Sequence, residues 1–439
     1  MNDMNVILVQ LPFPSQGEPL PQLSEYYKYY NKKYRQVFPE YYINDGELWE
    51  MPLWVAHMDG AIDRDDTIFL DLSKEEFNIE LCLNKIVSSV SSSSLIFFSP
   101  LAQNFSFTSN ISSKLKSLGY TTVIGGNMAD LASPEDYSKI YAGISRKGIY
   151  DEIVNSNDLI VGTKPKLGRQ QTSLSYKPKY RLLKPYDKKV PLIRINASHG
   201  CLYSCSFCGD AWTKQLHEVD LHHLREEVEE IRINYPDTKI IYIGDKTFGQ
   251  SKQAVKNLLE VLKPEYGFKL IVQTHILQIN DWLLDAMEKL NVKVVEMGFE
   301  TADSQVLKEM KKGHKGSVVF EDALKSLKDR GFKTVLNILS GLPNETRESQ
   351  NETIKFINET KNLVWLYNHY NFVPYPKTPL YPIIKDRITN WNFDEWREDK
   401  PPVFTPKHQS VEDSYMHFLN VVDFTTDILK EQLLQKAGD

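Results

Sequence analysis

Six apolar runs that alternate with helical patterns restrict the fold of this chain more than any other feature. Between the runs, apolar residues recur every three or four positions, as in LHHLREEVEEIRINY and DWLLDAMEKLN. Six strand–helix units within residues 191–380 are too many for a small sheet and predict a partial (β/α) barrel, whose chemistry lies at the carboxyl ends of its strands. The predicted strands are LIRINAS, IIYIGD, KLIVQTH, VKVVEMGFE, FKTVLNILSG and VWLYNHYNFVPY.

Residues 1–163 also alternate between strand and helix patterns. Apolar runs bounded by turn residues predict five strands, and patterns such as SKEEFNIELCLNKIVSSV and NISSKLKSLG predict helices between them. Such alternation implies a parallel sheet covered by helices, with ligands at the carboxyl ends of the strands. The predicted strands are Asn5–Pro12, Thr67–Leu72, Leu95–Pro100, the run YTTVIGG and Asp158–Thr163.

Two further segments complete the predicted organisation, which is α/β throughout. Residues 164–190 are basic, contain prolines and lack periodicity, so we expect a solvated linker between the two domains. Residues 381–439 are rich in aromatic side chains and end in a helical pattern, YMHFLNVVDFTTDILKEQLLQ. We expect this extension to cap the barrel.

Charge and cysteine content narrow the class of protein. The 439 residues carry a net charge of −6, which predicts no binding to nucleic acid or to an anionic membrane surface. No apolar run approaches the ~18 residues of a membrane span, so the expected compartment is the cytoplasm. Four cysteines in a chain of this length do not make a disulfide framework.

Three of those cysteines, Cys201, Cys205 and Cys208, follow the first barrel strand with C-x3-C-x2-C spacing. Thiolates in one loop suit zinc or the irons of a cubane cluster. The fourth, Cys82, lies in an apolar helical face of the other domain and is expected to be a core residue. A three-legged cubane would leave one iron open. The alternatives are a structural zinc site completed by His199 or His217, and a chance cluster of thiols.

The segment CLYSCSFC, with Phe207 before its last cysteine, resembles the C-x3-C-x-aromatic-C motif of the radical S-adenosylmethionine (SAM) family. The resemblance implies that the three cysteines hold a [4Fe–4S] cluster. It further implies that the open iron chelates SAM and that reduction yields a 5′-deoxyadenosyl radical. A one-electron reductant of the flavodoxin or ferredoxin type is then the expected partner.

Later segments resemble the same family in the same order. The resemblance places Asp245 of YIGDKTFGQ at the mouth of the barrel and directs Glu300 of VVEMGFE toward SAM. Ser340 and Gly341 begin a G-L-P-x-E-T turn whose backbone would lie near the adenine and ribose. FVPYPKTPLY is similar to the family's sixth-strand segment, except that Lys377 replaces the usual glycine.

Several of these side chains also have structural interpretations. Glu300 could stabilise the next helix through its dipole, and Asp245 could cap the following turn. His275 could contact substrate or SAM, or be a structural histidine. Tyr203 and Phe207 could shield the cluster or simply pack beside it.

A sheet domain ahead of the barrel resembles the cobalamin-binding subgroup of the family, in which that domain is Rossmann-like. Ser99 and Leu101 follow one predicted strand, and Gly125 and Gly126 follow another, where glycines let the backbone approach a flat ligand. The D-x-H-x-x-G loop of histidine-ligated cobalamin proteins does not occur, and His57 belongs to a helical segment. The domain either binds cobalamin or keeps the fold and shapes the substrate site.

The sequence therefore predicts a radical SAM enzyme that abstracts hydrogen from a peptide or a small natural-product substrate. With cobalamin, the expected outcome is methylation. Without it, the alternatives are epimerisation, dehydration or cyclisation. A non-catalytic, zinc-stapled binding protein is the alternative from another class.

Overall fold

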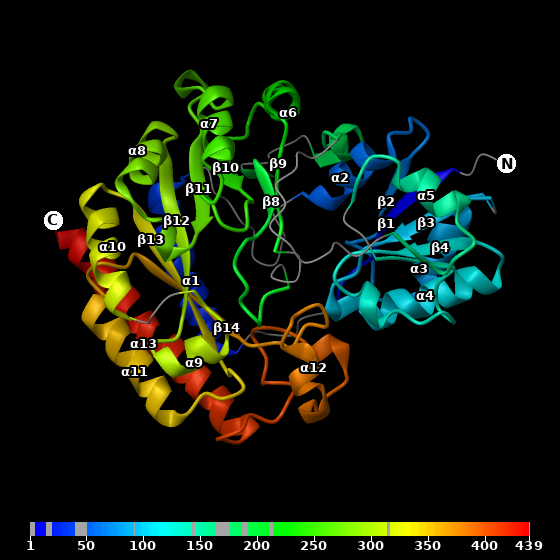
Figure 1. The fold of residues 1–439 in the computed structure, drawn as a ribbon. Coiled ribbons are helices and arrows are strands. Elements are labelled where there is room, and N and C mark those ends of the chain that lie inside the picture. The colour runs from blue at the N-terminus through cyan, green and yellow to red at the C-terminus, as the bar shows by residue number, and fades with distance from the viewer. Residues whose placement is uncertain are drawn as a thin grey trace.

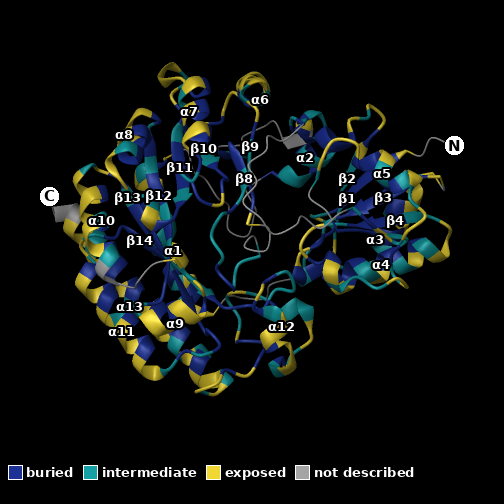
Figure 2. Cartoon of the chain, viewed as in Figure 1, coloured by how far each residue is buried: buried dark blue, intermediate teal, exposed yellow. Residues whose placement is uncertain are grey.

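The chain forms two separate six-stranded parallel sheets, which Figure 1 shows in opposite halves of the molecule. Figure 2 shows that the strands are largely buried and that the helices expose their outer faces. No described helix is long and apolar enough to cross a membrane. The computed structural model describes residues 5–14, 20–39, 51–91, 93–142, 145–162, 176–186, 192–209, 214–313 and 317–438.

The first sheet has the strand order β2-β1-β3-β4-β5-β6 and contains one strand that the sequence did not predict. That strand, β5, has only three residues, which is too short for a recognisable apolar run; the predicted fifth strand is β6. The order reverses beside β1, and ligands of such sheets bind at this kind of reversal. The strands are β1 (Val6–Gln10), β2 (Ile68–Asp71), β3 (Leu95–Phe98), β4 (Thr121–Ile124), β5 (Lys139–Tyr141) and β6 (Ile160–Val161).

The helices of this half cover both faces of the sheet. The helix predicted from Ser73 onward begins later, because the Asn78 side chain accepts a hydrogen bond from the Leu81 amide and caps it there. Cys82 lies in this helix and is fully buried, as predicted for a core residue. The helices are α2 (Leu53–Ile62), α3 (Ile79–Ser89), α4 (Phe105–Ser117) and α5 (Ile149–Asn155).

The second sheet has the order β14-β13-β12-β11-β10-β7, and all six predicted barrel runs are strands of it. Every pair is parallel, and β7 and β14 are the edge strands, as in a barrel that does not close. The strands are β7 (Leu192–Ile195), β10 (Ile240–Ile243), β11 (Lys269–Thr274), β12 (Val292–Glu300), β13 (Lys333–Ser340) and β14 (Leu366–Asn371).

Polar caps fix where the barrel helices begin. Asp220, Ser251, Asn280, Asp303 and Thr346 each accept backbone N–H groups at the start of the helix that follows. The helices are α6 (Leu221–Asn234), α7 (Lys252–Val261), α8 (Asp281–Lys289), α9 (Ser304–Glu309), α10 (Ser317–Asp329) and α11 (Arg347–Thr360).

Helix α1 (Pro21–Val37) belongs to the barrel half, although it follows β1 in sequence (Figure 1). The predicted range of the first domain is wrong in this respect. Lys33 Nζ donates to the carbonyl of Trp365 at 2.7 Å, and the Tyr26 hydroxyl donates to the carbonyl of Tyr367. Both carbonyls lie at or beside β14, so α1 covers that edge strand. The range 1–163 is therefore not one spatial unit.

The described part of the predicted linker, residues 176–186, is not a solvated connector. Tyr180 and Leu183 are buried in the core shared by both halves. The Lys179 amide donates to the carbonyl of Ala56 at 2.9 Å, and the Tyr180 hydroxyl donates to Glu227 Oε1 at 2.7 Å. This stretch fastens α2 to α6; the rest of the predicted linker lies outside the described residues.

We expect Glu227→Gln to stabilise the protein at pH 8 and to have little effect at pH 5. Burial raises the pKa of Glu227 from 4.5 to about 7, and the hydrogen bond from Tyr180 offsets this only in part. The folded state therefore favours the neutral acid, and wild-type stability is lost as the pH rises from about 4.5 through 7. The difference in unfolding free energy should approach about 2–3 kcal/mol at pH 8. Melting temperatures measured at both pH values check this; equal shifts at both would contradict it.

The C-terminal extension contacts both halves, in keeping with the predicted cap. It contains α12 (Tyr381–Ile384) and α13 (Val411–Gly438). Trp396 is fully buried, and its carbonyl accepts a hydrogen bond from Gln103 of the first domain at 3.3 Å. Phe393 packs edge-on against Phe105, with ring centroids 5.4 Å apart. Helix α13 packs along α1 and β14.

Candidate active site

The three-cysteine loop is held at its base by an antiparallel pair of strands that the sequence did not predict. These strands, β8 (Ser198–Gly200) and β9 (Leu216–Glu218), pair residue for residue and lie between the two halves (Figure 1). Cys201 follows β8 directly, after Gly200, whose φ of +86° turns the chain. Residues 210–213 of the loop lie outside the described residues.

Backbone hydrogen bonds fix the middle of the loop against the barrel. The Ser206 amide donates to the carbonyl of Met310 at 2.8 Å, and the Leu380 amide donates to the carbonyl of Ser206 at 2.9 Å. Cys201 and Cys205 are buried and Cys208 is partly exposed. The thiols are thus presented at the carboxyl end of the barrel strands, where the sequence predicted them.

Two polar side chains from the turn after β10 approach the Cys201 sulfur. Gln250 Nε2 lies 3.3 Å from Sγ and the Thr247 hydroxyl lies 3.6 Å from it. Gln250 also accepts a hydrogen bond from the Leu202 amide. Hydrogen bonds to ligating sulfurs tune the potential of iron–sulfur clusters. Both residues lie in YIGDKTFGQ, but sequence reasoning singled out neither of them.

Asp245 lies directly after β10 and contacts the segment that follows β7. Its carboxylate is buried and accepts hydrogen bonds from the Ala197 and Ser198 amides and from the Ser198 hydroxyl, at 2.6–2.9 Å. Burial raises its pKa to about 6, against these hydrogen bonds. It caps no helix, since Ser251 starts α7. Asp245 therefore positions the segment that leads into β8, and a contact with a cofactor remains a prediction.

Glu300 forms a buried ion pair with Lys312, a residue that sequence reasoning missed. Lys312 Nζ lies 2.7 Å from Glu300 Oε1, and both side chains are about nine-tenths buried. Burial opposes the charged ammonium, but Glu300 and the nearby cysteines outweigh it, so the pKa of Lys312 is raised. The ammonium also lies 5.7 Å from the centre of the Phe207 ring. The pair thus joins β12 to the cysteine loop.

The backbone around this pair is unusual. Glu300 has a φ of +68°, at a bulge between β12 and β13, and this left-handed conformation is costly for a non-glycine residue. A Cβ on Gly298 would overlap the Glu300 carboxylate and the Lys312 ammonium. Asp303, and not Glu300, caps α9. The Glu300 carboxylate pairs with Lys312, while Asp303 takes the capping position at the start of α9.

Tyr203 and His275 form a packed pair beside the cysteines. Their rings stack with centroids 4.0 Å apart and planes 22° apart. The Tyr203 hydroxyl accepts a hydrogen bond from Gln278 at 2.8 Å, and His275 Nδ1 accepts one from the Leu277 amide at 3.2 Å. His275 thus has a structural role at the end of β11, and Tyr203 packs against it from the cysteine loop.

Ser340 and Gly341 lie where β13 ends. Gly341 has a φ of +70°, and its amide donates to Glu345 Oε2 at 2.9 Å. Burial raises the pKa of Glu345 to about 7, although Gln350 and backbone amides stabilise the carboxylate. The turn is therefore shaped by its own glutamate, and its contact with the adenosine of SAM remains a prediction.

The four residues predicted from the first domain lie close to one another and to the barrel. A Cβ on Gly126, whose φ is +78°, would come within 2.7 Å of the Ser99 hydroxyl. Leu101 is 51% exposed, which is high for a leucine, and a Cβ on Gly125 would meet no neighbouring atom. Lys377 Nζ donates to the carbonyl of Gly126 at 2.6 Å. The residue that replaces the family's glycine therefore joins the two halves.

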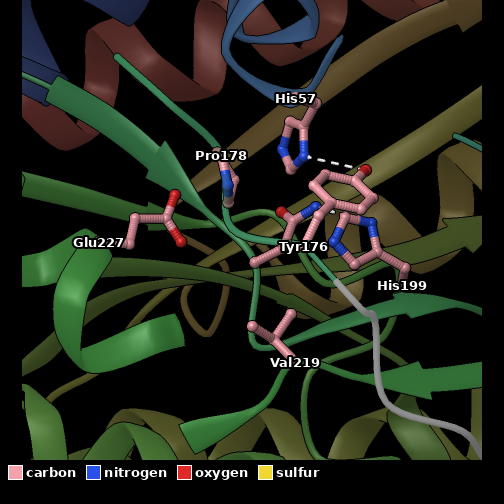
Figure 3. Close-up of a pocket in the computed structure, with 7 residues that line it drawn as sticks. His57, Tyr176, Pro178, His199, Val219 and Glu227 are labelled. Atoms are coloured by element: carbon pink, nitrogen blue, oxygen red, sulfur yellow. Dashed lines mark hydrogen bonds between the residues drawn. The ribbon is translucent and has the colours of Figure 1, made fainter. Parts of the chain in front are cut away.

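The histidines of the zinc alternative lie elsewhere. Figure 3 shows His199 in a small pocket between the two halves, with His57 and Tyr176 above it. The rings of His57 and His199 are 5.4 Å apart, and His199 Nδ1 lies 3.2 Å from the Asn196 amide nitrogen. His217 contacts Gln215. Among the described residues, no three His, Cys, Asp or Glu side chains are placed to bind one metal ion.

The donor set fits a cubane cluster. A cubane takes one thiolate at each of three irons, so its ligands need not converge on a single ion. Cys205 and Cys208 both lie near Lys312, and Cys201 lies near Cys205. When ligated, the thiolates place negative charge beside this ammonium.

Comparisons with known proteins agree with this geometry. Residues 195–357 match the Radical SAM superfamily. The chain is 27% identical over 242 residues to an uncharacterised methyltransferase of Pyrococcus horikoshii, a match that covers 53% of this chain and 51% of that protein. It is 22% identical over 331 residues to the bacteriochlorophyllide d C-12(1)-methyltransferase of Chlorobaculum tepidum, covering 71% and 70% of the two chains. The chain thus matches only about half the length of the first of these relatives.

The fold as a whole is similar to a solved radical SAM structure. The methyltransferase TsrM from Kitasatospora setae, with cobalamin and a [4Fe–4S] cluster bound, superposes with a TM-score of 0.58 at 14% identity. The match covers 89% of this chain and 79% of that one, so it includes the N-terminal sheet as well as the barrel. With the matched residues 195–357 and the CLYSCSFC loop at the barrel mouth, the chain contains a domain of the Radical SAM superfamily.

Proposed function

We propose that this protein is a cobalamin-dependent radical SAM methyltransferase. The cysteine loop would hold the cluster and SAM, the carboxyl edge of the first sheet would hold the corrin, and the substrate would lie between them. Methyltransferase is also the activity in the names of the two relatives above. A flavodoxin or ferredoxin would supply electrons.

The observation that carries this proposal is the hydrogen bond from Lys377 to Gly126. Lys377 follows β14 at the mouth of the barrel, and Gly126 follows β4 at the carboxyl edge of the first sheet. The hydrogen bond between them is 2.6 Å long, so the two edges are in contact. Two cofactors held at these edges would face each other, as methyl transfer between them requires.

The residues of the first edge suit a corrin. Gly125 lies beside open space and Leu101 offers exposed apolar surface, so a flat ligand can approach the backbone there. Ser99 lies directly behind Gly126 and leaves no room for a larger residue. His57 points into the interdomain pocket of Figure 3, so the proposal does not use it as a ligand of cobalt.

The side chains of this protein would hold the cofactors and orient them. Three thiolates would bind the cluster, and Gln250 and Thr247 would hydrogen-bond to one of them. Lys312 keeps the Glu300 carboxylate in place at the end of β12. The bound cofactors would supply an electron for SAM and a carrier for its methyl group.

Corrin binding tests this proposal. The reconstituted protein is incubated anaerobically with hydroxocobalamin, separated by gel filtration and examined by absorbance. We expect about one corrin per chain. A Gly126→Val variant should lose most of it, because its side chain would meet Ser99. No retained corrin would overturn the proposal and leave hydrogen-abstraction chemistry such as epimerisation, dehydration or cyclisation.

Lys377→Met should weaken corrin binding about tenfold while iron content stays near wild type. The change removes a charge-assisted hydrogen bond of about 1.5–3 kcal/mol at most, and it keeps the length of the side chain. Absorbance titration measures the corrin affinity. An unchanged affinity would show that the hydrogen bond from Lys377 to Gly126 does not shape the corrin site.

A further inference from the structure

A hydrogen-bonded route leads from the middle of the cysteine loop to the surface. The Ser206 carbonyl accepts a hydrogen bond from the Leu380 amide at 2.9 Å, and the Leu380 carbonyl accepts one from the Ile383 amide at 3.0 Å. Ser206 is bonded directly to Cys205. Ile383 lies on α12 and is 72% exposed, although it is a large aliphatic residue. Only Ser206 and Leu380 therefore separate a predicted cluster ligand from an exposed residue along this route.

Helix α9 contacts the same residue of the loop through its amide. The Ser206 amide donates to the carbonyl of Met310, which directly follows α9. Met310 and Val306 of α9 pack in the same apolar core as Leu380 and Ile384 of the C-terminal extension. Figure 1 shows α9 and α12 on the same lower side of the molecule. The loop is thus held between the end of α9 and the start of α12.

The surface around these two helix ends is basic, although the chain carries a net charge of −6. Three segments form it, residues 304–312, 381–388 and 403–408, with six basic and two acidic side chains. The last two segments meet at Pro343, whose carbonyl accepts hydrogen bonds from the Lys407 amide at 3.0 Å and from the Arg387 guanidinium at 3.2 Å. One basic residue, Lys312, is buried; the other five, here called the basic surface, are Lys308, Lys311, Lys385, Arg387 and Lys407.

The two acidic side chains of these segments leave an excess of positive charge. The Glu309 carboxylate accepts hydrogen bonds from two amide side chains, and one of them, Asn344, joins α9 to the other two segments. Lys308, Lys311 and Lys385 are exposed, and none of them forms an ion pair with an acidic side chain among the described residues. Such charges attract a partner of opposite sign over roughly 8–10 Å.

Lys311 occupies a position that usually takes glycine. Its φ is +53°, just beyond the end of α9, where the Lys312 amide donates to the carbonyl of Leu307. Glycine adopts this left-handed conformation most easily, and it commonly ends helices in this way. A lysine therefore costs stability at this position, where it adds an exposed charge to the basic surface.

We infer that the basic surface is the docking site of an acidic one-electron carrier protein, with Ile383 in the contact and Leu380 and Ser206 leading the electron to the loop. The carrier loses one electron and the cluster gains it, and no bond forms or breaks. Contacts between electron carriers are small, and charge sets their rate of association. An exposed aliphatic residue beside lysines fits such a contact. The inference rests on the cluster in the proposed function, but not on corrin or substrate.

Reduction of the reconstituted cluster by a bacterial flavodoxin tests the inference. The flavodoxin, in its fully reduced form, is mixed anaerobically with the protein, and stopped-flow absorbance follows the bleaching of the cluster. Lys308→Glu/Lys311→Glu/Lys385→Glu should lower the second-order rate constant at least tenfold at low ionic strength, and added salt should narrow the difference. Reduced methyl viologen is a small cation, so it should reduce this variant at least as fast as wild type.

Lys256→Glu/Lys263→Glu/Lys328→Glu is the matched control, because it changes the net charge equally on exposed lysines of other segments. It should keep a flavodoxin rate within about twofold of wild type. Lys311→Gly should slow flavodoxin while its melting temperature stays at or above that of wild type, which separates docking from folding. The inference is overturned if both triple variants are slowed equally, or if neither is. Iron content, measured in every sample, shows separately whether the cluster assignment holds.

Discussion

Cys205→Ala should abolish both the iron–sulfur cluster and the reductive cleavage of SAM. A cubane held by three thiolates loses a third of its protein ligands, and Cys205 lies near Lys312, Glu300 and Cys201. Iron and sulfide, about four of each per chain in the reconstituted wild type, should fall to background. Metal analysis and chromatography of the products of SAM measure the two losses.

Cys82→Ala is the control for this variant. Cys82 is more deeply buried than the three cluster cysteines, and it lies in α3 within the core of the first sheet. It should keep its iron and cleave SAM at the wild-type rate, with some loss of thermal stability. Normal iron in Cys205→Ala, or background iron in Cys82→Ala, would refute the assignment of ligands.

Lys312→Met should destabilise the protein by about 3–5 kcal/mol, because it leaves the buried Glu300 carboxylate without its partner. Methionine fills nearly the same volume, so the effect reports the lost charge and not a cavity. We also expect SAM binding to fall at least tenfold, since Glu300 would no longer be held at the end of β12. Denaturant unfolding and SAM titration measure the two effects.

Two further variants separate the ion pair from general damage. The double variant Glu300→Gln/Lys312→Met removes both charges and should recover most of the stability but not the SAM affinity. Gly298→Ala disrupts the pair from the backbone side, since its methyl group would overlap both charged groups. A double variant as unstable as Lys312→Met alone would show that charge pairing is not the cause.

Most of the fold could be predicted because its strands are apolar and alternate regularly with helical patterns. All six barrel runs became strands, and the final helix formed where its periodicity indicated. The elements that the sequence did not predict are short or depend on contacts between distant segments. Strand β5 has three residues, and β8 and β9 exist only because they pair with each other. The sequence of α1 shows that one face is aromatic, but it does not show that this face covers β14, which lies more than 300 residues away.

The same difference between local patterns and contacts of distant segments applies to the candidate site. Cys201, Cys205 and Cys208 are close in sequence, so their spacing alone indicated a common ligand. The partners of the other groups come from distant segments. Lys312 follows Glu300 by twelve residues, and the two charges meet where the bulge at Glu300 interrupts the pairing of β12 with β13. Lys377 stood out as a departure from the family pattern, and its contact with Gly126 gives that departure a physical reason.

The fate of the methyl group of SAM tests the central proposal most directly, and it needs no knowledge of the substrate. The protein, loaded with cluster and corrin, is mixed anaerobically with SAM that carries a trideuterated methyl group, together with a low-potential reductant. Mass spectrometry then follows the label. We expect up to one labelled methyl group per chain in the protein-bound corrin fraction, and none in Cys205→Ala, in which SAM has lost its site. Bound corrin that stays unlabelled while SAM is consumed would contradict a cobalamin-dependent methyl transfer.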